Sequence, residues 1–179
     1  MSPRSAARLA PALVAATLAF AQYNIGRAPS AEEIRGADIT VLPDGSGLPA
    51  GQGSAVAGEP IYAARCAECH GPKAEGRKGE YPALAGGRGT LATPKPVKTV
   101  GSYWPYATTV WDEINRAMPF NAPHVLRPDD VYAVTAYVLY LNGIVTRDQV
   151  LNEKTLPKVV MPNRGGFILD TRPDIKSRR

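Results

Sequence analysis

The sequence is poor in side chains that bind metals or form cross-links. Its 179 residues include two cysteines, Cys66 and Cys69, and two histidines, His70 and His124. A structural zinc site takes four Cys, His or carboxylate ligands. Beyond the cluster at 66–70, the chain has one histidine to add to such a set, so zinc is the weaker interpretation of this cluster.

The sequence also lacks a strong excess of charge and a long apolar run. The formal net charge is +5, and it falls to +3 without Arg4 and Arg8 near the N-terminus. This charge is too small and too evenly spread to indicate nucleic-acid binding. The apolar run from Leu9 to Ala21 is shorter than the roughly 20 residues of a membrane span, so none is predicted.

What the sequence does contain is the motif Cys66-Ala67-Glu68-Cys69-His70. Two cysteines separated by two residues and followed by histidine are typical of the attachment site of a c-type haem (heme c). The two thiols reach the vinyl groups and form thioethers, and the histidine ligates the iron. A thioredoxin-like redox pair is an alternative, but no βαβ pattern surrounds the motif. With both cysteines on one haem, none is left for a disulfide.

The N-terminal residues 1–21 resemble an export signal. Arg4 and Arg8 precede the apolar run, which ends in the small-x-small pattern Ala19-Phe20-Ala21. This order is typical of a signal peptide. An uncleaved anchor or a buried helix is the alternative. Because c-type haem is attached outside the bacterial cytoplasm, we expect a cleaved leader and a periplasmic protein.

Helical patterns are confined to the middle of the chain. Gly58, Ile61, Tyr62 and Arg65 lie at helical spacing, with Glu59 and Pro60 in a first turn, in a helix that carries the motif at its C-terminal end. Further helices are expected over 106–117 and 129–142, the last apolar on nearly every side and therefore buried. We expect a domain over 54–145, between an extended N-terminal arm over 22–53 and an extended C-terminal arm over 146–179.

Both arms are rich in turn-forming residues and have little apolar periodicity. We therefore expect them to form no core of their own. We expect them to enlarge a binding surface instead, at little cost in folding. A flexible linker is the alternative for the N-terminal arm, and a loose tail for the C-terminal one.

A long Gly/Pro-rich loop over 71–105 follows the motif. Such a loop is expected around a haem, because it packs on the porphyrin. A backbone carbonyl near Pro82 is the candidate acceptor for the second ring nitrogen of His70, a bond that fixes the imidazole and raises its basicity. An ordinary turn proline is the alternative. Trp104 and Trp111 are aromatic residues that can wall a haem or donate to a propionate, although a plain core position is the better explanation for each of them.

The second axial position of the iron has three candidates past the leader, Met118, His124 and Met161. Met118 is favoured because it lies in a proline-bounded loop between the two later helices, on the side that His70 leaves open. A Met/His pair fills both axial positions and raises the potential, which suits electron transfer. The candidate cofactor-binding residues are therefore Cys66, Cys69, His70 and Met118. His70 and Met118 are the metal ligands, and no catalytic residue is predicted.

These residues resemble a class I cytochrome c, an all-α fold that here carries a single haem and long irregular arms. The stretches Tyr81–Gly87, Thr99–Thr109, Arg116–Phe120 and Tyr132–Ile144 resemble, more narrowly, the cytochrome subunits of bacterial sulfite dehydrogenase and sulfane dehydrogenase. The likeness extends over roughly residues 24 to 175. The sulfane dehydrogenase cytochrome carries a second haem domain, whereas this chain has one haem motif.

The resemblance implies a non-catalytic electron-transfer subunit of a molybdenum-dependent sulfur-compound dehydrogenase. Its partners would be the molybdenum-containing dehydrogenase subunit, which donates electrons, and a soluble cytochrome c, which accepts them. Two alternatives stay open: a free periplasmic electron carrier without a fixed partner, and a haem enzyme or sensor with an open iron site.

Overall fold

The computed structural model describes residues 26–168. The chain divides into two units, with the boundary after Asp38. The described part of the first unit contains the short helix α2 (Ala31–Ala37). Ser30 and Glu33 cap its N-terminus reciprocally, because each side chain bonds the other residue's backbone N–H. None of the residues of α2 is buried. The predicted signal peptide, residues 1–21, lies outside the described residues.

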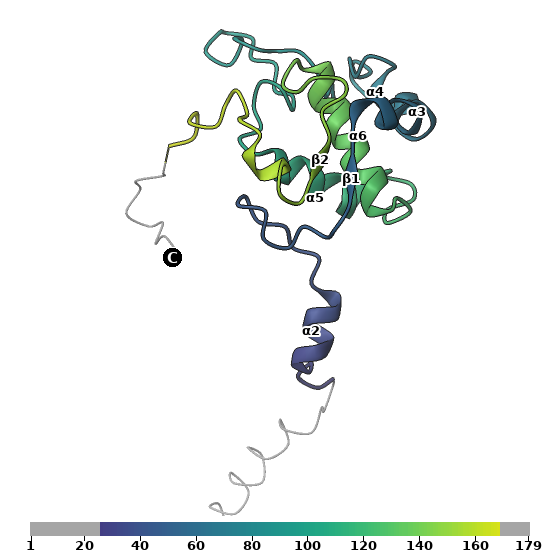
Figure 1. The fold of residues 1–179 in the computed structure, drawn as a ribbon. Helices are drawn as coiled ribbons and strands as arrows, with labels where there is room; N and C mark the ends of the chain where they lie inside the picture. The colour runs from purple at the N-terminus through teal and green to yellow at the C-terminus, as the bar shows by residue number, and fades with distance from the viewer. Residues whose placement is uncertain (1–25, 169–179) are drawn as a thin grey trace, which may run out of the picture. The chain divides into compact units, whose positions relative to one another are not determined.

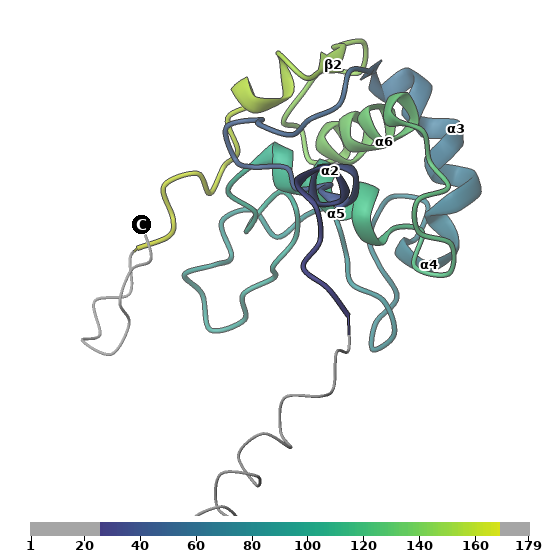
Figure 2. The same ribbon diagram turned by 90° about the horizontal axis from the view of Figure 1, so that it is seen from below.

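The second unit, from Ile39 onward, is mostly helical (Figures 1 and 2). Its helices are α3 (Ala55–Arg65), α4 (Ala67–His70), α5 (Ala107–Ala117) and α6 (Pro128–Leu141). A pair of two-residue strands, β1 (Gln52–Gly53) and β2 (Leu151–Asn152), and the 3-10 helix η3 (Leu156–Lys158) complete it. The all-α fold is confirmed, and the three expected helices are present as α3, α5 and α6. Helix α3 begins at Ala55, so Pro60 lies inside it and not in its first turn as expected. None of the helices within 26–168 is long and apolar enough to cross a membrane.

Helices α3 and α6 cross closely, and glycine makes this crossing possible. A Cβ atom at Gly58 would lie 2.0 Å from the carbonyl oxygen of Ala133, far inside van der Waals contact. Beside it, the rings of Tyr62 and Tyr137 pack with centroids 5.2 Å apart. The crossing fixes the C-terminal end of α3, and with it the start of the haem motif, against the core.

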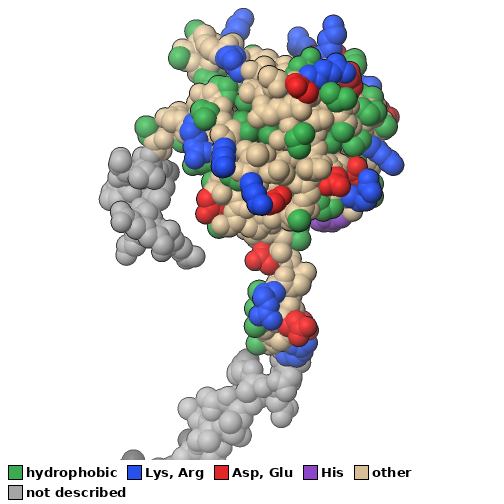
Figure 3. Space-filling view, viewed as in Figure 1, with side chains coloured by type: hydrophobic (Ala, Val, Ile, Leu, Met, Phe, Trp, Pro, Cys, Tyr) green, Lys and Arg blue, Asp and Glu red, His purple; other side chains and the backbone are tan. Residues whose placement is uncertain are grey.

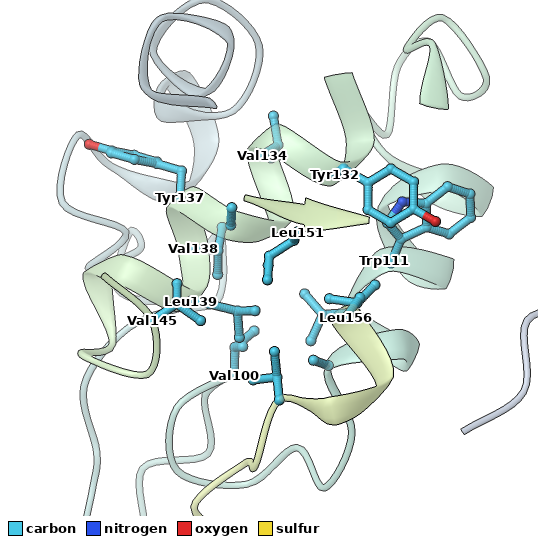
Figure 4. Packing of buried hydrophobic residues seen from close by; sticks show 14 of the residues in the cluster. Val100, Trp111, Tyr132, Val134, Tyr137, Val138, Leu139, Val145, Leu151 and Leu156 are labelled. Atoms are coloured by element: carbon cyan, nitrogen blue, oxygen red, sulfur yellow. The ribbon is translucent and has the colours of Figure 1, made fainter. Parts of the chain in front are cut away.

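The core is built around α6, whose residues 131–139 are all buried (Figure 4). Proline at its first position and acidic residues in its first turn favour its N-terminus. Trp111 of α5 packs on Tyr132 with ring centroids 5.4 Å apart. A helix buried on all sides is consistent with the lack of a polar face in its sequence.

The segments on either side of the helices, residues 39–53 and 144–168, also contribute to this core, although they contain little regular structure. We call them the flanking segments. Strands β1 and β2 pair antiparallel, with Gly53 opposite Leu151. Leu151, Leu156 and Met161 are at most 1% exposed and belong to the same apolar cluster as α6. These residues of the C-terminal segment therefore wrap the domain and join its core, and they form no separate core of their own.

Candidate haem site

The motif lies at the junction of two helices. Cys66 ends α3 with a φ of −122°, and α4 carries the rest of the motif up to His70. The amide of His70 donates to the carbonyl of Cys66 at 2.9 Å, which holds the two cysteines and the histidine on one helical turn. Gly71 then ends the turn with a φ of +78°, in the left-handed region that favours glycine.

A tight backbone framework orients the imidazole of His70. Its Nδ1 lies 2.9 Å from the carbonyl oxygen of Pro82, and because a carbonyl only accepts, Nδ1 carries the proton. The predicted acceptor is therefore confirmed. The bond leaves Nε2 unprotonated and free to act as a ligand. A small turn, in which the backbones of Arg77 and Tyr81 bond each other, leads directly into Pro82.

The two cysteines are half-buried free thiols. Burial, with a smaller contribution from the neighbouring Cys69, raises the pKa of Cys66 to about 11. Over residues 26–168, no group of three or more Cys, His, Asp or Glu side chains converges as a metal site would require. The structure therefore supports the thioether interpretation over the zinc one.

The three candidates for the second axial position lie in different environments. Met118 is half-buried and directly follows α5, with its amide bonded to the carbonyl of Ile114 at 3.1 Å. His124 is exposed and has a φ of +65°, in the left-handed region. Met161 is 1% exposed within the apolar core. Of the two methionines, only Met118 is outside the packed core, which favours it as the ligand.

Two buried polar groups have no partner within the described residues 26–168, the indole Nε1–H of Trp111 and the hydroxyl of Thr135. An unpaired buried donor costs about 1–3 kcal/mol. At the motif itself, two thiols and one oriented imidazole fit a covalent haem. Trp104 is only partly buried.

Sequence reasoning missed the residue that joins the long loop to the core, Asn142. Its side-chain amide donates to the carbonyl of Leu84 at 3.1 Å, and its oxygen accepts from the amide of Gly86 at 3.1 Å. Gly101 packs so closely that a Cβ there would lie 2.0 Å from the same oxygen. An asparagine after an apolar helix indicates a helix end in the sequence, and nothing in the pattern indicates partners so far away.

The comparisons with known proteins agree with this site. The family model described as Cytochrome c matches residues 55–142, which include the motif, α5, Met118 and α6. The chain belongs to the cytochrome c family, and its fold is that of a class I cytochrome. No match was found among curated proteins.

Among solved structures, the chain is similar to a chain of the sulfane dehydrogenase SoxCD from Paracoccus pantotrophus. The two share 48% sequence identity with a TM-score of 0.77. The match covers 84% of this chain and 74% of the other. It therefore extends well beyond the residues that the family model describes.

Proposed function

We propose that the protein is a periplasmic mono-haem c-type cytochrome. In this proposal it takes electrons from a molybdenum sulfite or sulfane dehydrogenase and passes them to a soluble cytochrome c. Family membership supports the electron-transfer role, because haem c is the cofactor of this family. The similarity to a chain of a sulfane dehydrogenase supports the partner.

In the proposed holoprotein, Cys66 and Cys69 would form the thioethers, and His70 and Met118 would hold the iron. The haem, when bound, supplies a one-electron couple between ferric and ferrous iron. Pro82 keeps the proton of His70 on Nδ1 and raises the basicity of the ligating nitrogen. A thioether from Met118 would favour the ferrous state and, with His70, leave no open position for a substrate. Such a site exchanges electrons with a partner and performs no catalysis of its own.

The extent of the similarity is the observation that carries the partner proposal. The family model accounts for residues 55–142, whereas the match to the dehydrogenase chain covers 84% of the sequence. The likeness therefore includes the flanking segments that complete the core, and it is a likeness to a chain of a dehydrogenase complex over most of the sequence. This supports a fixed partner of the same kind.

Stopped-flow reduction of the haem-loaded protein tests this proposal. Sulfite, and separately a sulfane-sulfur donor, is mixed with the protein in the presence and absence of the proposed molybdenum dehydrogenase. We expect rapid haem reduction only with the enzyme. Ascorbate, added to both mixtures, is the control that the haem is reducible. Equal rates with and without the enzyme, or full turnover by the cytochrome alone, would show that the subunit proposal is wrong.

Haem attachment is tested separately. After acid denaturation and extraction with organic solvent, the haem should stay with the polypeptide, at one haem per chain. The double replacement of Cys66 and Cys69 by serine is the matched control, and it should release haem into the solvent phase. Release from the unmodified protein would exclude thioether attachment.

A further inference from the structure

The loop over residues 86–98 is rigid although it contains neither helix nor strand. Across its base, the hydroxyl of Thr99 donates to the carbonyl of Gly86 at 2.6 Å, and the hydroxyl of Ser102 donates to that of Val97 at 2.6 Å. Within the loop, the hydroxyl of Thr90 accepts from the amide of Val97 at 2.9 Å. We call residues 86–98 the basic loop. Its side-chain hydrogen bonds preorganise it, and preorganisation reduces the entropic cost of binding.

The C-terminal segment lies against this loop and leaves a groove between them. The side-chain amide of Asn163 donates to the carbonyl of Tyr103 at 2.7 Å, and Phe167 packs edge-on to the ring of Tyr103 with centroids 5.2 Å apart. A cavity of about 350 Å³ opens here, and a second of about 260 Å³ adjoins it through shared lining residues, among them Leu91 and Asn163. The two cavities together form what we call the Leu91 groove.

The charge on the walls of the Leu91 groove has one sign. The sequence has no Asp or Glu between Glu80 and Asp112, and none between Glu153 and Asp170. These two stretches nevertheless carry six exposed cations in the described structure: Lys154, next to Glu153, and the five cations of the groove region, Arg88, Lys95, Lys98, Lys158 and Arg164. In Figure 3, Lys and Arg side chains project from the left of the molecule, where the loop and the C-terminal segment lie in Figure 1.

These cations lack the carboxylate partners that arginines have elsewhere. Arg116, Arg127 and Arg147 each pair with a carboxylate of this chain. Within residues 26–168, none of the five cations of the groove region forms an ion pair. Two of them lie on aromatic rings instead: Lys98 is 5.0 Å from the ring centroid of Tyr103, and Arg164 is 4.2 Å from that of Tyr106. Their positive charge is therefore held in place and left for an external anion.

We propose that the Leu91 groove binds an acidic segment of a partner protein. Carboxylates of the segment would meet Arg88 and Lys98, the two cations among the lining residues, and an apolar side chain would enter between Leu91 and Phe167. The apolar lining favours a polypeptide over a phosphate polymer or a free anion, because neither of those has an apolar group to bury. The proposal does not depend on which enzyme reduces the haem.

Nuclear magnetic resonance on the nitrogen-15-labelled haem protein tests this proposal at low ionic strength. The probe is a short synthetic peptide of glutamates flanking one phenylalanine, and the control peptide has glutamine in place of glutamate. We expect the acidic peptide to shift the amide signals of residues 86–102 and 162–167, and added salt to reverse the shifts.

Charge-neutralising variants then locate the binding surface. Arg88→Gln combined with Lys98→Gln is expected to weaken peptide binding by about tenfold, the effect of two partly exposed charge pairs. The matched control, Arg77→Gln combined with Lys78→Gln, neutralises an exposed arginine and lysine in another loop and should leave the affinity unchanged. Phe167→Ala should weaken binding while leaving its salt dependence as it was. Melting curves and haem spectra of all variants verify that they are folded.

Several outcomes would overturn the proposal. One is the absence of binding by the acidic peptide at low ionic strength, and another is equal binding by the glutamine peptide. Shifts centred on residues 77–78 would place the binding elsewhere. Sulfite, inorganic phosphate or phosphatidylglycerol vesicles at the same concentration of negative charge serve as competing probes. If one of these reproduces the shifts, the groove is a general anion site and the peptide proposal is wrong.

Discussion

The helices and the flanking segments become buried in different ways. In α6, burial extends over a continuous run of nine residues, and the apolar pattern of the helix is visible in the sequence. In residues 39–53 and 144–168, single apolar side chains such as Leu151, Leu156 and Met161 are buried as completely, yet their neighbours in the chain are often exposed. Burial therefore does not require periodicity, provided that something else fixes the backbone.

Specific contacts fix the backbone of the flanking segments. The hydroxyl of Tyr132 donates to the carbonyl of Pro49 at 2.9 Å, and that of Thr108 donates to the carbonyl of Pro43 at 3.2 Å. A Cβ at Gly53 would lie 2.3 Å from the amide nitrogen of Ala133, so the strand and α6 are in direct contact. The flanking segments therefore complete the core, and the helices by themselves would leave apolar surface uncovered.

Removing the C-terminal flank should have the largest effect. A chain that ends after Asp148 lacks Leu151, Leu156 and Met161. Loss of each large core side chain costs about 2–5 kcal/mol, against a total stability of about 5–15 kcal/mol. We expect the truncated protein to lose cooperative thermal unfolding, measured by circular dichroism. The control is a chain that ends after Ile168, which keeps these residues and should melt near the full-length protein. Cooperative melting of both chains at the same temperature would show that the C-terminal flank is not needed to complete the core.

Replacing Met118, which follows α5, and Met161, which lies in the C-terminal flank, distinguishes a haem ligand from a core residue. Met118→Ala should remove the proposed axial ligand, so that the ferric protein loses its near-infrared sulfur-to-iron band and binds cyanide, while the ferrous protein binds carbon monoxide. It should also be easier to oxidise, because a thioether favours ferrous iron. Met161→Leu should leave the spectrum intact and lower stability by less than about 1.5 kcal/mol. Absence of this band from the unmodified protein, with cyanide binding opened by His124→Ala and unchanged by Met118→Ala, would assign the ligand to His124.

Within the C-terminal flank, two positions test whether only the buried side chains contribute to stability. Leu156 is fully buried, whereas Val160, four residues later, is 79% exposed. Leu156→Ala should destabilise the protein by about 2–5 kcal/mol, and Val160→Ala by less than about 0.5 kcal/mol. Urea unfolding followed by tryptophan fluorescence gives both values. Similar losses at the two positions would mean that the flank packs loosely.

The smallest effect is expected at two buried threonines. The hydroxyl of Thr135 in α6 is buried and has no hydrogen-bond partner over residues 26–168, whereas that of Thr108 donates to Pro43. Thr135→Val should raise the free energy of unfolding by about 1 kcal/mol, because an unpaired polar group is removed, and Thr108→Val should lower it by a similar amount. The same urea titrations decide the signs. A loss at Thr135 would show that its hydroxyl has a partner in the holoprotein.

The sequence predicted the parts of the molecule that follow local rules. The spacing in Cys66–His70, the helical pattern of α6 and the turn into Pro82 depend on nearby residues, and the His70–Pro82 hydrogen bond was predicted from them. The β1–β2 pairing, the burial of Leu156 and the anchoring by Asn142 were not predicted. They join residues that lie far apart in the chain, and no periodic pattern indicates such contacts. Met118 as the axial ligand stays a prediction.

The pairing of β1 with β2 also bears on the order of events when the protein is made. Gly53 precedes the haem motif, and its partner Leu151 comes long after it. The core therefore cannot close until the C-terminal flank is present. In a chain that is translocated from its N-terminus, as the proposed export requires, Cys66 and Cys69 emerge while Leu151, Leu156 and Met161 are still absent. The thiols then remain accessible to the haem-attachment machinery during this interval, before folding encloses them.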